Sequence, residues 1–375
     1  LIPMLQNAGA IVFTPRERDW QTNEIVIDND DAVKSVYYFE KEAGKRWKNC
    51  DSLGFANRYR LKDGENPFRM GTVRQAKATK RKKTSQVSYQ PRFKEDGKYA
   101  VYVSYQSLPK SVSDARYIVY HKGEATEFSV NQRMGGGTWV YLGTFDFDKG
   151  CNEFNRVVCT NKASRRGVVT TDAVRFGGGM GNIERGGYTS GLPRCLEGAR
   201  YYAQWAGAPY KVYGGRKGEN DYADDINTRS LMTNWLGGGS VYMPAKNGKH
   251  VPIELSLALH SDAGYNKDGK STVGSLAICT TDYNDGILNS GISRFTSKDF
   301  ARALRDNLVT DLTAQFGEFG KRYLWDRNYS ETRLPEVPSA ILEMLSHQNF
   351  PDMRIAQDPL GKFYIARSIY KTILR

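Results

Sequence analysis

Long apolar stretches are missing from this sequence, and so are the short motifs of several enzyme classes. The longest apolar runs, such as residues 253–259, are far shorter than the roughly 18 to 20 residues of a membrane-spanning helix. We therefore expect no membrane span. The first ten residues hold neither a basic region nor a cleavage site, so we expect no signal peptide within them, although one could have been removed. The chain also has no G-x-S-x-G, no P-loop and no H-E-x-x-H motif, which removes three common kinds of site.

Histidine and cysteine are both scarce. The chain has four histidines, so any metal or acid–base site must draw on few candidates. Its five cysteines form no C-x-x-C pair, which excludes a zinc ribbon, and their odd number argues against a full disulfide framework. Of these, Cys151 and Cys159 lie close enough along the chain for a local bridge.

Positive charge is in excess, with 54 Lys and Arg against 41 Asp and Glu, a net charge of +13. Such an excess favours polyanionic partners, including nucleic acid, anionic polysaccharide, cell-wall polymer and acidic lipid. The densest basic stretch, residues 77–83, contains no aromatic residue and is surrounded by Thr, Ser and Gln. That pattern is typical of a solvated loop, so we expect no nucleic-acid partner.

Short alternating apolar runs, separated by turn residues every 8 to 12 positions, fill the chain between residues 33 and 176, which predicts a β-sandwich. Its strands are expected at residues 99–105, 116–120, 126–130, 138–142, 156–159, 167–170 and 173–176.

Helices and strands alternate from residue 191 onward. We expect helices at residues 192–205, 224–235 and 355–374 and after Ser297, and strands at residues 210–213, 253–259, 275–279 and 339–342. Residues 10–13 predict one more strand near the start. The simplest assembly is an α/β domain around a mostly parallel sheet, split by the inserted sandwich, with limits at 1–31, 32–180 and 181–375.

His260 follows the apolar strand 253–259 directly, whereas His121 and His250 lie in polar turns. Ligands of open α/β sheets bind beyond the carboxyl ends of the strands, so His260 is the candidate for a metal ligand or catalytic group. A packed core histidine is the alternative.

Glu343 is a lone carboxylate after another apolar strand. Burying it costs free energy unless it is paired or binds a metal, and a salt bridge or a helix N-terminus is the alternative explanation. His347, four residues on, could share a helical face with Glu343 and support it. Because Asp224, Asp225 and Asp262 are also available, a paired-carboxylate glycosidase stays open.

Three elements resemble zinc-dependent N-acetylmuramoyl-L-alanine amidases, in the order of that family. They are Leu5-x-x-x-Gly9 with Thr14, Arg16 and Asp19; Ser256-Leu-Ala-Leu-His260-Ser-Asp-Ala263; and Val337-Pro-Ser-Ala-Ile-Leu-Glu343 with Asn349. The resemblance implies a three-layer α/β fold, Zn²⁺ bound by His260, and Glu343 as the catalytic base. Asp262 stands where the family has Asn, and we expect Asp262, Arg333 and His347 to contact substrate.

The inserted segment resembles golvesin-like, xanthan-lyase-type carbohydrate-binding sandwiches. The matching runs are Tyr89-x-Pro91, Gly97-Lys-Tyr-Ala-Val-Tyr-Val103, Gly136-Gly-Thr-Trp-Val-Tyr-Leu-Gly143 and Val169-x-x-Asp172-Ala-Val-Arg-Phe176. The combination is similar to secreted Bacteroides-type proteins labelled xanthan lyase. It implies peptidoglycan or another cell-surface glycan as partner, and a periplasmic, cell-surface or secreted location.

The family's other two zinc ligands, a His and a Glu, precede its Thr-Arg element, and the 13 residues before Thr14 contain neither. We therefore expect those ligands upstream of this chain. Two other functions stay open. A glycan-binding protein without activity could stack sugars on Trp139 and tyrosines, although most of these are expected in the core, and a polysaccharide lyase or glycosidase could act on acidic polysaccharide.

Overall fold

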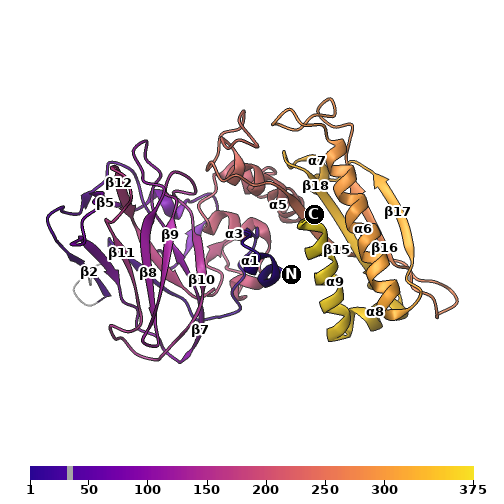
Figure 1. The fold of residues 1–375 in the computed structure, drawn as a ribbon, viewed down its shortest axis with the longest axis horizontal. Helices are drawn as coiled ribbons and strands as arrows, with labels where there is room; N and C mark the ends of the chain where they lie inside the picture. Colours follow the sequence, from indigo (N-terminus) through magenta and orange to yellow (C-terminus); the bar gives the residue numbers. More distant parts are fainter. Residues whose placement is uncertain (32–36) are drawn as a thin grey trace. The chain divides into compact units, whose positions relative to one another are not determined.

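The computed structural model describes residues 1–31 and 37–375 and divides them into two compact units (Figure 1). Unit 1 comprises Leu1–Phe13, Arg229–Gly248 and Pro252–Arg375, and unit 2 comprises Thr14–Thr228 and Lys249–Val251. Neither contains, in the part of the chain described, a helix long and apolar enough to cross a membrane.

Unit 2 is built on two antiparallel sheets. One has the order β1 (Ile25–Asp28), β13 (Ala173–Phe176), β7 (Gly97–Val103) and β10 (Val140–Phe147). The other has the order β2 (Tyr38–Lys41), β6 (Gln86–Tyr89), β11 (Arg156–Thr160), β8 (Ala115–His121) and β9 (Glu124–Val130). Alternate residues of both sheets, such as Val101, Tyr117 and Val157, meet in one buried core. This packing of two sheets confirms the predicted sandwich.

Smaller elements complete unit 2. A three-stranded sheet joins β12 (Val168–Thr171), β5 (Arg74–Lys77) and β3 (Lys48–Asn49), and β14 (Ile183–Glu184) pairs with β4 (Leu61–Lys62). Short helices follow at η1 (Pro67–Arg69), η2 (Arg194–Leu196), α3 (Ala199–Trp205) and α4 (Tyr210–Tyr213), and α5 (Asp221–Gly237) crosses the division between the units.

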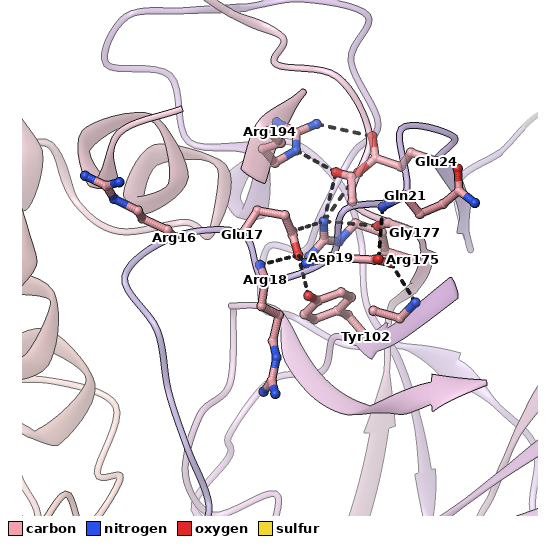
Figure 2. Close-up of polar contacts among 12 residues, drawn as sticks. Arg16, Glu17, Arg18, Asp19, Gln21, Glu24, Tyr102, Arg175, Gly177 and Arg194 are labelled. Carbon is pink, nitrogen blue, oxygen red and sulfur yellow. Dashed lines mark hydrogen bonds and ion pairs between the residues drawn. The ribbon is translucent and has the colours of Figure 1, made fainter. Parts of the chain in front are cut away.

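A buried ionic network fastens the segment after Thr14 to the sandwich (Figure 2). Arg175 of β13 is fully buried and lies 2.5 Å from Glu17, and its guanidinium packs over the Tyr102 ring. Tyr102 also donates a hydrogen bond to Glu17 at 2.5 Å. Burial alone would raise the pKa of Glu17, but the charge of Arg175 and the hydrogen bonds that Glu17 accepts from Tyr102, Arg175 and the Asp19 backbone together outweigh it and hold that pKa below its usual value. Arg194 and Glu24 extend the network with a 3.2 Å ion pair.

Two buried carboxyl groups, Asp28 and Asp172, lie beside each other in the same sandwich, because Asp28 pairs in register with Ala173. Burial raises the pKa of both groups, and for Asp28 the neighbouring Asp172 raises it further. Asp172 accepts a hydrogen bond from the backbone N–H of Phe55, and Asp30 adds further negative charge near both.

Because the pKa values of these two carboxyl groups are raised in the folded state, we expect unit 2 to lose stability as the pH rises. The unfolded chain releases their protons near pH 4, whereas the folded chain holds them to higher pH, so the folded state binds more protons in between. The free energy of unfolding should therefore fall with pH, by about 1.4 kcal/mol per pH unit for each extra proton. Denaturant unfolding at pH 5, 7 and 9 measures this slope. Asp172→Asn should make it shallower, and an unchanged slope would refute the explanation.

Unit 1 is organised around a four-stranded sheet of order β15 (Ser256–Asp262), β18 (Ser339–Ser346), β16 (Ser275–Cys279) and β17 (Lys321–Asp326). β15 runs parallel to β18 and β16 parallel to β17, but β16 and β18 are antiparallel, so the sheet is mixed. Helix α6 (Phe295–Phe316) packs Leu304, Leu308 and Leu312 on one face, together with α9 (Pro359–Ile373) (Figure 1). The remaining helices are α1 (Ile2–Asn7), α7 (Ser330–Arg333) and α8 (Phe350–Gln357).

Several sequence predictions need correction. Residues 10–13 form no strand: they pair with no other strand among the described residues, and Ile11 and Phe13 are exposed. Residues 210–213 are helical rather than extended, and the predicted last helix is two helices, α8 and α9, with Asp358 capping the second. The predicted helix over 192–205 is likewise divided, into η2 and α3.

The compact units also divide the chain at other residues than the predicted limits of 31 and 180. Strand β1, within the predicted first segment, pairs with β13 of the sandwich, and unit 2 continues to Thr228. A strand belongs to the unit that contains the strand it pairs with. The local sequence of β1 does not indicate which strand that is. The five cysteines are free thiols, so the expected bridge between Cys151 and Cys159 is absent.

Candidate active site

His260 and Glu343 lie directly opposite each other on the neighbouring parallel strands β15 and β18. Both lie within the carboxyl-terminal half of their strands, whereas the sequence predicted that each would directly follow its strand. Nδ1 of His260 is 3.5 Å from Oε1 of Glu343, and their side chains are 31% and 12% exposed. The structure therefore brings together the two residues predicted for the site and leaves the imidazole accessible to solvent. Their roles stay predictions.

A second carboxylate, that of Glu331 in α7, meets the other nitrogen of the same ring. Its Oε2 is 3.0 Å from Nε2 of His260, and its Oε1 is 3.2 Å from Nη1 of Arg229. Side chains of α5 hold this helix in place, because Ser230 donates to the carbonyl of Ser330 and Asn234 to that of Leu334.

Sequence reasoning missed Glu331 and Arg229. Glu331 lies in a four-residue helix within a polar stretch, where no periodicity marks it, and Arg229 is about 100 positions away. The only nearby signal was the resemblance that drew attention to Arg333, two residues further on.

The two carboxylates change the charge of His260. Hydrogen bonding to Glu331, and then to Glu343, outweighs partial burial and raises the pKa of His260 to about 9. At neutral pH the ring is therefore positively charged, with a hydrogen on each nitrogen. Burial opposes ionisation of Glu331, but hydrogen bonding and the charge of His260, with Arg229, leave its pKa below the usual value.

The two carboxylate oxygens of Glu343 differ in their contacts. While Oε1 faces His260, Oε2 is buried and has no hydrogen-bond partner among the described residues. An unpaired buried carboxylate oxygen costs free energy, and it can accept a hydrogen bond where a donor comes within reach. Within the described part of the chain, Oε2 of Glu343 therefore lacks a partner, whereas the two oxygens of Glu331 have His260 and Arg229.

The other predicted residues have protein partners of their own. Asp262 forms a 2.7 Å ion pair with Arg322. Arg333 donates to Asn328 at 2.6 Å, and its guanidinium lies 5.8 Å from the centre of the Tyr283 ring. Among the contacts described, neither Asp262 nor Arg333 touches His260 or Glu343.

His347 is exposed, and its Nδ1 is 3.2 Å from Oγ of Ser261, the neighbour of His260 in the chain. Glu343 lies within strand β18, which continues to Ser346, so the two residues do not share a helical face as predicted. The strand extends because residues 339–346 pair with β15 on one side and β16 on the other.

These residues do not complete a zinc site. Zinc in catalytic sites takes three protein ligands and an open position. Here Glu331 and Glu343 approach different nitrogens of His260, so an ion at either nitrogen would meet the imidazole and one carboxylate. Across residues 1–31 and 37–375, no group of three or more His, Cys, Asp or Glu is arranged to hold a metal ion.

Comparison with known proteins assigns part of unit 2. Residues 62–178 match the family model of the Golvesin C-terminal domain, which confirms the predicted golvesin-like resemblance for this segment. A xanthan lyase of Bacillus sp. (strain GL1) is 33% identical over 97 residues, which are 25% of this chain and 10% of that enzyme. The chain therefore spans about a tenth of the length of the curated relative it matches.

Solved structures of a xanthan lyase and of an amidase are among those similar to parts of the chain. The xanthan lyase of Paenibacillus is 21% identical with a TM-score of 0.32, and covers 41% of this chain and 13% of its own. The N-acetylmuramoyl-L-alanine amidase of Clostridium difficile 630 is 13% identical with a TM-score of 0.28, and covers 44% of this chain and 77% of its own. Scores this low establish no activity for this chain, whose site must be judged from its own residues.

Proposed function

We propose that this chain is a cell-wall hydrolase that cleaves the amide bond between N-acetylmuramic acid and L-alanine in peptidoglycan. One observation carries the proposal: Glu343, with a free carboxylate oxygen, lies opposite the accessible His260 on adjacent parallel strands. The substrate follows from the resemblance of the segments around these two residues to amidases. A periplasmic, cell-surface or secreted location follows from that substrate.

In this proposal Glu343 moves the proton. A water oxygen attacks the lactyl carbonyl carbon, and Glu343 accepts the proton that the water loses. The carbon–nitrogen bond then breaks, and Glu343 returns the proton to the departing amine of L-alanine. Glu331, held by Arg229, keeps the His260 ring in place, so that its Nδ1 side faces Glu343.

Zinc binding by His260 remains a prediction from the resemblance. The metal would need ligands that the described residues do not provide, so no step above depends on it. The sandwich would add glycan binding, because its sequence motifs resemble those of golvesin-like carbohydrate-binding sandwiches, and residues 62–178 match the Golvesin C-terminal domain. Trp139, one candidate for sugar stacking, is buried against Phe55 and Trp205 and belongs to the core.

The products of peptidoglycan digestion test this proposal. The protein, with its metal content measured in parallel, should release peptides with new L-alanine amino termini and no new reducing sugar ends. A glycosidase would instead release reducing ends, and a lyase unsaturated sugars. If the protein binds peptidoglycan without releasing any of these, a glycan-binding function replaces the proposed one.

A further inference from the structure

An exposed aromatic pair lies on the edge strand β17 of unit 1. The rings of Tyr323 and Trp325 are stacked, with centres 6.1 Å apart and planes inclined by 14°. Tyr323 is 68% exposed, whereas Trp325 packs against the buried residues Ile278 and Ile341. The inner ring therefore supports the outer one and holds its plane.

This pair lies on the same face of the sheet as the candidate active site. Successive side chains of a strand point to opposite faces, so residues two apart share a face. Trp325 packs with Ile341 and Ala258, so these three residues share one face of the sheet. Glu343 is two residues after Ile341 and His260 is two residues after Ala258, so both lie on that face as well. The opposite face, which includes Leu324, packs against α6 and α9.

The register of the strands gives the distance between Tyr323 and Glu343. His260 pairs with Glu343, and Glu343 pairs with Leu276 on the next strand. On β17, Lys321 pairs with Ser275 and Leu324 with Ala277, and the irregularity between these pairs leaves both Arg322 and Tyr323 alongside Leu276. Tyr323 is therefore about two strand spacings, or about 10 Å, from Glu343.

Such a ring suits a sugar. A pyranose presents a face of axial C–H groups that packs on an aromatic ring, while its hydroxyls remain in water. Tyrosine offers a large apolar face and a polar end at a low cost in conformational entropy. A small amide held at Glu343 would not extend to Tyr323, two strands away.

We propose that Tyr323, supported by Trp325, is a stacking subsite for a sugar ring of a glycan strand whose linked amide reaches Glu343. The subsite deepens the proposed function and rests on it for the reaction, but sugar binding by Tyr323 can be measured without any turnover.

Binding of a tetramer of N-acetylglucosamine to the full chain, followed by calorimetry, tests the subsite. Tyr323→Ala should weaken one class of sites by at least about fivefold, because aromatic anchors dominate such contacts. Tyr323→Phe should bind like the original, since the ring face is kept. Phe363→Ala serves as the control, because Phe363 is a 48% exposed aromatic residue on α9, which packs on the other face. Sites on the sandwich would form a separate class unaffected by these changes.

The same variants separate this inference from the proposed function. On peptidoglycan, Tyr323→Ala should raise KM and leave kcat nearly unchanged, because stacking contributes equally to substrate and transition state. If the Ala variant binds the tetramer as well as the original, the subsite is refuted even where amide hydrolysis is found. If binding depends on Tyr323 but the original releases no L-alanine termini, the subsite stands and the proposed reaction fails.

Discussion

Glu343→Gln should leave the protein folded and lower the rate of amide hydrolysis by about 10²- to 10⁴-fold, the usual effect of losing a general base. Gln has nearly the same shape as Glu, so it can still face His260 at the position where Oε1 now lies, 3.5 Å from Nδ1. It cannot accept a proton at neutral pH, and the free oxygen of Glu343 loses its function. Release of L-alanine termini from peptidoglycan, at saturating substrate, measures the loss.

A second carboxylate of unit 1 provides the control. Glu336 is also largely buried, and its ion pairs are with Lys246 at 3.1 Å and Arg294 at 3.8 Å rather than with His260. Glu336→Gln should cost stability but keep the rate per folded molecule, as judged by circular dichroism and thermal unfolding. Equal rates for Glu343→Gln and the unaltered protein would exclude Glu343 as the base.

Arg175→Met should destabilise unit 2 by about 3 to 5 kcal/mol, the cost of leaving one partner of a buried ion pair alone. The change removes the guanidinium 2.5 Å from Glu17, and both side chains are fully buried. Glu17 then keeps only hydrogen bonds, including that from Tyr102, to offset its buried charge. Urea unfolding measures the loss, with the m-value compared to confirm that the same cooperative unit unfolds.

A matched Arg→Met substitution at an exposed ion pair of the same sandwich gives the loss of stability with which Arg175→Met is compared. Arg116 of β8 pairs with Glu127 at 2.9 Å, but these side chains are 35% and 51% exposed. Arg116→Met should therefore cost between about 0 and 1 kcal/mol. Adding Glu17→Gln to Arg175→Met should restore part of the lost stability, because it removes the unpaired charge. A similar cost for the two Arg→Met changes would show that the network in Figure 2 contributes little.

The strands of the sandwich could be predicted from the sequence because the alternation of apolar and polar residues that marks a strand is a local feature. Strands that are buried on one face alternate apolar and polar residues, and β7, β8, β9, β10, β11, β12 and β13 all fall close to the predicted runs. The sequence singled out His260 and Glu343 because each is a polar group at an apolar run, where such a group needs a partner or a function. The structure places the two opposite each other within β15 and β18, and their roles remain predictions.

Only the tertiary structure decided which residues meet. Residues 10–13 have an apolar pattern suited to a strand, but a strand needs a neighbour for its backbone hydrogen bonds, and none pairs with them in the described structure. The placement of α5 and α7 brings Glu331 to His260 and Arg229 to Glu331. The register of β16 and β17 places Tyr323 level with Glu343 across the sheet. The periodicity of apolar residues along the sequence indicates which face of a helix or strand is buried. It carries no information about the element opposite, because contacts across the fold depend on register and on strand order, and these are set by the packing of the whole unit.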